Sequence, residues 1–114
     1  MNQIVMKHKI TLPQLKKYDI TQKVIMALAD AESRVILFSI IRKGKTASDL
    51  SGSLKIPLSS VYKKLSDLEN LTLVQVEKTI LSEKGRRFKI YRSRINKAEI
   101  SIKKPEPTLS LSAN

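Results

Sequence analysis

Apolar residues recur with a helical period over the first part of the chain. From Ile20 onward they follow the i, i+3, i+4 spacing of a buried helix face. Asp30 then predicts the start of a second helix over 31–43, because its carboxylate can accept a hydrogen bond from a free backbone N–H. Two basic residues in the last turn and Gly44 after it suit a helix C-terminus. The apolar residues that define these two helices are Val24, Ile25, Leu28, Ile36, Leu37, Ile40 and Ile41.

Two more helices follow, separated by only a few residues. Thr46 opens the first of them, with Asp49 three residues later in a variant of the capping box. A tight turn over 55–57 leads into a helix over 58–70, with Pro57 at or just before its first turn. Two helices joined by so short a turn form a helix-turn-helix. The inward-facing residues of the pair are Leu50, Leu54, Val61, Leu65 and Leu68.

The apolar period changes from helical to alternating after the fourth helix. Residues 73–81 and 87–94 are predicted as two strands, joined through 82–86. Gly85 is the natural residue for the positive φ that this hairpin needs. Helices, a helix-turn-helix and a β-hairpin in this order predict an α+β winged helix-turn-helix fold.

The flanking segments are harder to interpret. Pro13 argues against one long N-terminal helix, whereas Ile100 and Ile102 alternate with polar residues as in a strand. The expected organisation is an N-terminal arm over 1–18, the winged helix-turn-helix domain over 19–94, a C-terminal strand or dimerisation segment over 95–104 and a flexible tail over 105–114.

Composition and charge narrow the choice of partner. The 114 residues suffice for one core, and 22 Lys and Arg against 10 Asp and Glu give a net charge of +12. Solubility alone is served by a net charge of about 2–8 in a small domain. The larger excess indicates a polyanionic partner, of which nucleic acid is the commonest. Nine basic and only two acidic residues lie between Glu83 and Lys104, which makes the predicted hairpin the most basic part of the chain.

Two sets of side chains are candidates for contact with DNA. A helix can enter the major groove if one apolar stripe anchors it and its opposite face carries short polar and basic side chains. A basic hairpin tip suits contact with the sugar-phosphate backbone or the minor groove. The candidates on helix 58–70 are Ser59, Ser60, Tyr62, Lys63 and Ser66, and those on the wing over 82–88 and just after it are Lys84, Arg86, Arg87 and Lys89.

Four stretches, in matching order, resemble segments of ArsR-like winged-helix transcription regulators. They are ALADAESRVIL over 27–37, TASDL over 46–50, LSSVYKKL over 58–65 and GRRFKIY over 85–91. The resemblance spans residues 20–94. It implies a dimeric DNA-binding fold, recognition through the fourth helix and, in many members, repression controlled by an effector.

The chain departs from that family at two points. Metal-sensing members carry Cys or His and Asp ligands, whereas this chain has no Cys and only His8, so metal sensing is not carried over and no cofactor is expected. Lys55 stands where the family usually has Gly, and a left-handed conformation there would cost about 1 kcal/mol. The strongly basic chain without metal ligands is more similar to winged-helix proteins common in archaea.

The sequence therefore predicts a transcription regulator that binds duplex DNA as a homodimer, with its effector unidentified. The longest apolar stretch is far below the ~20 residues of a membrane span, and residues 1–20 lack the apolar region of a signal peptide, so a cytoplasmic, chromosome-associated protein is expected. A non-specific architectural DNA binder, an RNA-binding winged helix and a protein–protein winged helix remain alternatives. An enzyme is not expected, because the sequence has no paired carboxylates, Gly-rich phosphate loop or nucleophile–base set.

Overall fold

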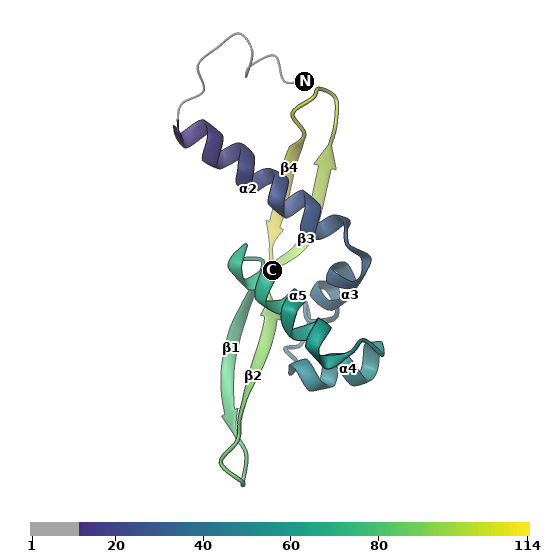
Figure 1. Ribbon diagram of the computed structural model, residues 1–114, viewed down its shortest axis with the longest axis vertical. Coiled ribbons are helices and arrows are strands. Elements are labelled where there is room, and N and C mark those ends of the chain that lie inside the picture. Colours follow the sequence, from purple (N-terminus) through teal and green to yellow (C-terminus); the bar gives the residue numbers. More distant parts are fainter. Residues whose placement is uncertain (1–11) are drawn as a thin grey trace.

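The computed structural model describes the backbone of residues 12–114 and the side chains from residue 19 onward. Within this range four helices precede two antiparallel β-hairpins, which gives an α+β architecture (Figure 1). Helices lie in the middle of a molecule of 61 × 24 × 24 Å, and the hairpins project towards opposite ends. The elements are α2 (Leu12–Ala29), α3 (Ala31–Ser39), α4 (Ala47–Leu54), α5 (Leu58–Asn70), β1 (Val74–Leu81), β2 (Arg87–Ser93), β3 (Ile95–Ser101) and β4 (Thr108–Ala113).

One aliphatic core joins the helices to the bases of both hairpins. The predicted apolar stripe of α5 is confirmed, since Val61, Leu65 and Leu68 are all fully buried. Ile25, Ile41 and Leu54, which were also predicted to face inward, are only half-buried. The other buried hydrophobic residues are Val24, Leu28, Ile36, Leu37, Ile40, Ala47, Leu50, Ile56, Leu73, Val74, Ile90, Tyr91 and Ile95.

The segment from α4 to α5 follows the prediction closely. Thr46 and Asp49 form the reciprocal capping box at the start of α4. Lys55 ends this helix with φ 57° and ψ 43°, the left-handed conformation for which Gly is usually selected. α5 then begins at Leu58, directly after Pro57, and has the predicted bounds.

α3 is shorter than predicted. It ends at Ser39, so Arg42 and Lys43 lie beyond the helix, and the prediction of a helix to residue 43 was wrong. The chain turns away to pair with β2, where Lys45 and Tyr91 exchange two backbone hydrogen bonds of 2.9 and 3.1 Å. Gly44 does not end the helix but permits this close approach.

The strand expected within 95–104 is present as β3, whereas the other two flanking segments differ from the prediction. α2 starts at Leu12, so residues 12–18 belong to a helix rather than to an arm, while residues 1–11 lie outside the described part. Pro13 is compatible with this helix because it occupies the first turn, where its missing N–H has no acceptor. The tail expected to be flexible over 105–114 instead supplies β4, which pairs with β3.

The first hairpin extends away from the helices. β1 and β2 pair from Val74–Ser93 at the base to Leu81–Arg87 near the tip. Gly85 has the predicted positive φ, at 80°. The second hairpin is fastened at its base by Asn114, whose side chain donates to the carbonyl oxygens of Ile41 and Ser93 at 2.8 and 2.9 Å.

Candidate nucleic-acid interface

The exposed face of α5 carries the side chains expected there. Ser59, Lys63 and Ser66 recur with helical spacing on the side opposite the buried stripe, and all three are exposed. Lys63 makes only a loose ion pair with Asp67, at 3.8 Å between exposed side chains. A pair of this kind holds its members weakly, so the Lys63 ammonium remains free to bind an anion.

Tyr62 and Ser60 flank this face on opposite sides. Tyr62 is half-exposed, on the side of α5 that faces the first hairpin. Ser60 is more buried than Tyr62 and lies on the opposite flank of α5. The structure therefore assigns Ser60 a less accessible position than the other α5 candidates.

The fold divides the basic run between Glu83 and Lys104. Lys84, Arg86, Arg87 and Lys89 lie on the outer half of the first hairpin and are exposed. Arg92 at its base is engaged internally, with Glu77 at 2.7 Å and the Ile41 carbonyl oxygen at 2.9 Å. The remaining members of the run belong largely to the second hairpin, at the other end of the molecule (Figure 1).

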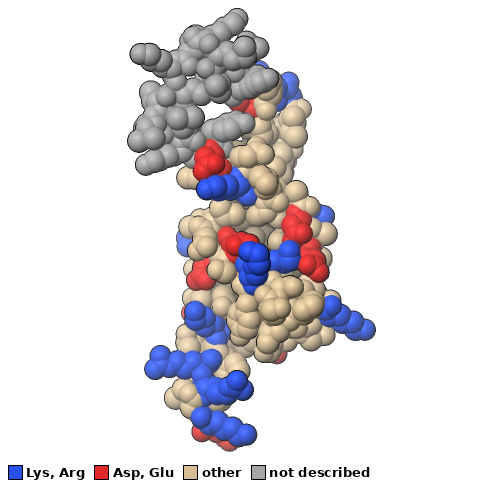
Figure 2. Space-filling view, in the orientation of Figure 1, with Lys and Arg blue, Asp and Glu red and all other residues tan. Residues whose placement is uncertain are grey.

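Positive charge consequently gathers at one end. Figure 2 shows Lys and Arg clustered over the β1–β2 hairpin at the lower end, and the tip of this hairpin also carries the acidic Glu83. Over the helices in the same view, basic and acidic side chains are interspersed. Lys78 of β1 is a further exposed cation of this hairpin, which was not among the predicted candidates. It pairs with Ile90 and so points to the face opposite Arg87 and Lys89.

A hollow of about 240 Å³ joins α4, α5 and the hairpin. Candidates from two distant parts of the chain meet there, namely Tyr62 of α5 and the pair Arg87 and Lys89 of β2. Arg87 and Lys89 share one face of β2 with Tyr91 because strand residues alternate. The hollow is lined by Thr46, Ser48, Tyr62, Arg87, Phe88, Lys89 and Tyr91.

The chemistry of this hollow suits a sugar-phosphate strand. It combines two cations with the hydroxyl groups of Ser, Thr and Tyr, which are side chains of the kinds that contact phosphate and sugar. Burial raises the pKa of the Tyr91 phenol above its usual 10.0. Thr46 and Ser48 were missed as lining residues because their sequence signal is that of a helix start. Lys84 and Arg86, at the hairpin tip, do not line this hollow.

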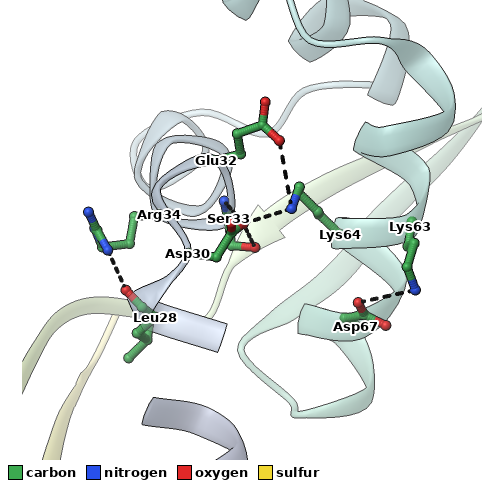
Figure 3. A network of polar contacts seen from close by, with 8 residues as sticks. All are labelled: Leu28, Asp30, Glu32, Ser33, Arg34, Lys63, Lys64 and Asp67. Carbon is green, nitrogen blue, oxygen red and sulfur yellow. Dashed lines mark hydrogen bonds and ion pairs between the residues drawn. The ribbon is translucent and has the colours of Figure 1, made fainter. Parts of the chain in front are cut away.

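A polar network fixes α5 against the start of α3 (Figure 3). The Lys64 ammonium lies 2.7 Å from Asp30 Oδ2 and 3.7 Å from Glu32 Oε1. The same Asp30 carboxylate caps α3 by accepting from the Ser33 backbone N–H at 2.9 Å and from its hydroxyl at 2.8 Å. One carboxylate therefore both starts α3 and holds the helix that presents the candidate residues.

The pKa values in this network follow from these contacts. The hydrogen bond from Lys64, followed by those from Ser33, lowers the pKa of Asp30 from 3.8 to about 2. The same hydrogen bond raises the pKa of Lys64 above 10.5. Both groups are thus charged at neutral pH, and α5 is held by a full ion pair.

No protein-family model matches the chain, and no curated protein matches it significantly. None of the described helices combines the length and apolar character needed to cross a membrane. Within the described residues, no three His, Cys, Asp or Glu side chains gather in a metal-binding arrangement.

Proposed function

We propose that the chain is a winged helix-turn-helix protein that binds duplex DNA and regulates transcription. In this proposal α5 enters the major groove and the β1–β2 hairpin is the wing. The observation that carries it is the hollow where Tyr62 of α5 meets Arg87 and Lys89 of the hairpin. A DNA backbone following this hollow would be held between the recognition helix and the wing.

The connectivity supports the same proposal. A short turn joins α4 to α5, and a hairpin of two strands follows directly. The isolated Lys45–Tyr91 bridge sets one residue of the α3–α4 connection beside β2, in the place of a very short third strand. Helix, short strand, helix-turn-helix and hairpin is the order expected of a winged helix-turn-helix domain.

The division of charge supports duplex DNA over an unstructured polyanion. Specific binding requires cations to be placed where phosphates lie, in addition to a net positive charge. Here the exposed cations of the hairpin project beyond the helices, whereas α5 offers hydroxyl groups and Lys63, with the exposed acids Asp67 and Glu69 nearer its C-terminus. Phosphate contacts by the wing would set the register, and α5 would contact base edges.

The first test measures affinity for duplex DNA against salt concentration. A dimer that neutralises about 6–10 phosphates is expected to lose roughly 10³–10⁵ in affinity between 50 and 200 mM salt. The double variant Arg86→Ala with Arg87→Ala should weaken binding to every sequence. It should also lower the salt slope by about 1 for each phosphate that the variant no longer neutralises.

A matched control removes the same charge from the other end of the molecule. Lys103→Ala with Lys104→Ala changes two exposed cations in the connection between β3 and β4. This variant should bind DNA like the unaltered chain. Equal losses in both double variants, or equal binding to heparin and DNA, would show a general polycation instead of a wing.

A second pair of variants tests α5. Lys63→Ala and Tyr62→Ala should each leave thermal stability nearly unchanged but lose about 1–3 kcal/mol on a duplex selected from a random pool. Leu65→Ala, which opens the core, should instead reduce stability by about 2–5 kcal/mol. Equal losses on all duplexes would indicate an architectural binder, and no loss would remove α5 from the interface.

A further inference from the structure

The second hairpin has one apolar and one polar face. Ala98 and Ile100 of β3 are paired with Leu111 and Leu109 of β4, so these four side chains share one face. Ala98 and Leu109 pack against the core, but Ile100 and Leu111 remain 42% and 40% exposed. The opposite face consists of Lys97, Glu99, Ser101, Thr108, Ser110 and Ser112. The apolar face is therefore only partly covered.

The two edges of this hairpin differ in chemistry. β3 carries an ion pair between Lys97 and Glu99 at 3.0 Å, and its pairing is irregular between Ile95 and Lys97. Charges and irregularities of this kind block the addition of another strand. β4, with the sequence TLSLSA, has no charge and no proline. In the described part of the chain no strand pairs with its outer edge.

We propose that β4 pairs antiparallel with β4 of a second copy, which forms a four-stranded sheet across a twofold axis. The absence of charge on β4 matters because two chains of net charge +12 repel one another over most of their surfaces. A two-stranded sheet is only marginally stable, and four strands with one apolar face are much more stable. The charged β3 edges then lie outermost, so assembly stops at the dimer.

The alternation of side chains excludes one-residue slips, and pairing leucine with leucine favours an axis at Ser110. A one-residue slip would set leucines against serines, because neighbouring residues point to opposite faces. With the axis at Ser110, Leu109 lies opposite the partner's Leu111 and the apolar face continues across the dimer. α2 contacts β4, and its N-terminal half extends past the hairpin in Figure 1. This overhang is placed to cover the added strands.

Molar mass measured by light scattering, without DNA, tests the dimer across a dilution series. The chain should give twice 12.9 kDa. Ser110→Lys should give the single-chain mass, because two ammonium groups would face each other at the axis. Within one chain this lysine lies opposite Glu99, so the hairpin itself is preserved. Ser101→Lys, the control on β3, should remain dimeric.

Cross-linking tests the register, because the chain has no cysteine. Ser110→Cys should form a covalent dimer on mild oxidation, since paired Cα atoms about 4.5–5.5 Å apart fit a disulfide. Ser101→Cys should stay monomeric on a non-reducing gel. A single-chain mass for the unaltered protein, or equal cross-linking of the two variants, would overturn the proposal. Neither measurement depends on DNA binding, so the two proposals fail independently.

Discussion

At the scale of single residues, Gly44 and Gly52 have very different surroundings. A Cβ at Gly44 would lie 2.5 Å from Ile90 Cγ2 and 3.1 Å from the Tyr91 carbonyl oxygen, whereas one at Gly52 would meet nothing within 4 Å. Gly44→Ala should therefore lower the free energy of unfolding by about 1–3 kcal/mol through overpacking. Gly52→Ala, in an exposed helix, should raise it by about 0.5–1 kcal/mol.

Urea denaturation of both variants checks this pair of predictions. The opposite signs matter because a general effect of adding a methyl group would change both free energies of unfolding in the same direction. If Gly44→Ala were as stable as the unaltered chain, the contact between the α3–α4 connection and β2 would not be close-packed. The Lys45–Tyr91 bridge would then contribute little to holding the β1–β2 hairpin against the helices.

At the scale of elements, the Asp30–Lys64 pair couples α3 to α5 and makes this coupling sensitive to pH. The folded-state pKa of Asp30 is lowered to about 2 from 3.8. A lowered carboxyl pKa stabilises the fold fully above the unfolded value, and this stability is lost as the pH falls through the folded value. The contribution of the ion pair should therefore disappear between about pH 4 and pH 2.

Asp30→Asn isolates this effect, because Asn caps a helix as well as Asp but cannot form the ion pair. Thermal unfolding of both proteins should show a lower midpoint for the variant at neutral pH. The difference should shrink as the pH falls towards 2, where Asp30 of the unaltered chain also becomes neutral. A difference that stays constant over this range would mean that the substitution acts through packing or capping alone.

Elements with strong local signals could be predicted from the sequence, and those fixed by distant contacts could not. The capping box at Thr46 and the apolar stripe of α5 act within one helix, so both were predicted correctly. The end of α3 depends instead on pairing between Lys45 and Tyr91, far apart in sequence. β4 was missed for the same reason, since its short alternating sequence becomes a strand only beside β3.

The candidate interface was likewise predicted only in part. The exposed residues of α5 and of the β1–β2 hairpin followed from periodicity and charge. The meeting of Tyr62 with Arg87 and Lys89 did not, because the hollow depends on how the hairpin packs beside α4 and α5. Charge counting along the chain also combined cations of the β1–β2 hairpin with Lys97, Lys103 and Lys104, which belong to the β3–β4 hairpin.

At the scale of the whole molecule, the two proposals place DNA binding and self-association at opposite ends. The β1–β2 hairpin projects from one end of the helices and the β3–β4 hairpin from the other (Figure 1). Pairing through β4 would leave both wings free. A dimer that reads successive major grooves needs its recognition helices about 34–36 Å apart. Because the two hairpins lie at opposite ends, a substitution in one of them should leave the surface of the other unchanged.

This separation predicts different DNA-binding defects for the two kinds of variant. Ser110→Lys, as a monomer, should bind a duplex with one half-site as tightly as each subunit of the unaltered dimer does. On a duplex with two half-sites it should lose the roughly 10²–10⁴-fold gain of bivalent binding, with about half the salt slope. Arg86→Ala with Arg87→Ala should remain dimeric and lose affinity for both duplexes. If monomeric Ser110→Lys bound the two-site duplex as tightly as the unaltered chain, binding would not use the dimer.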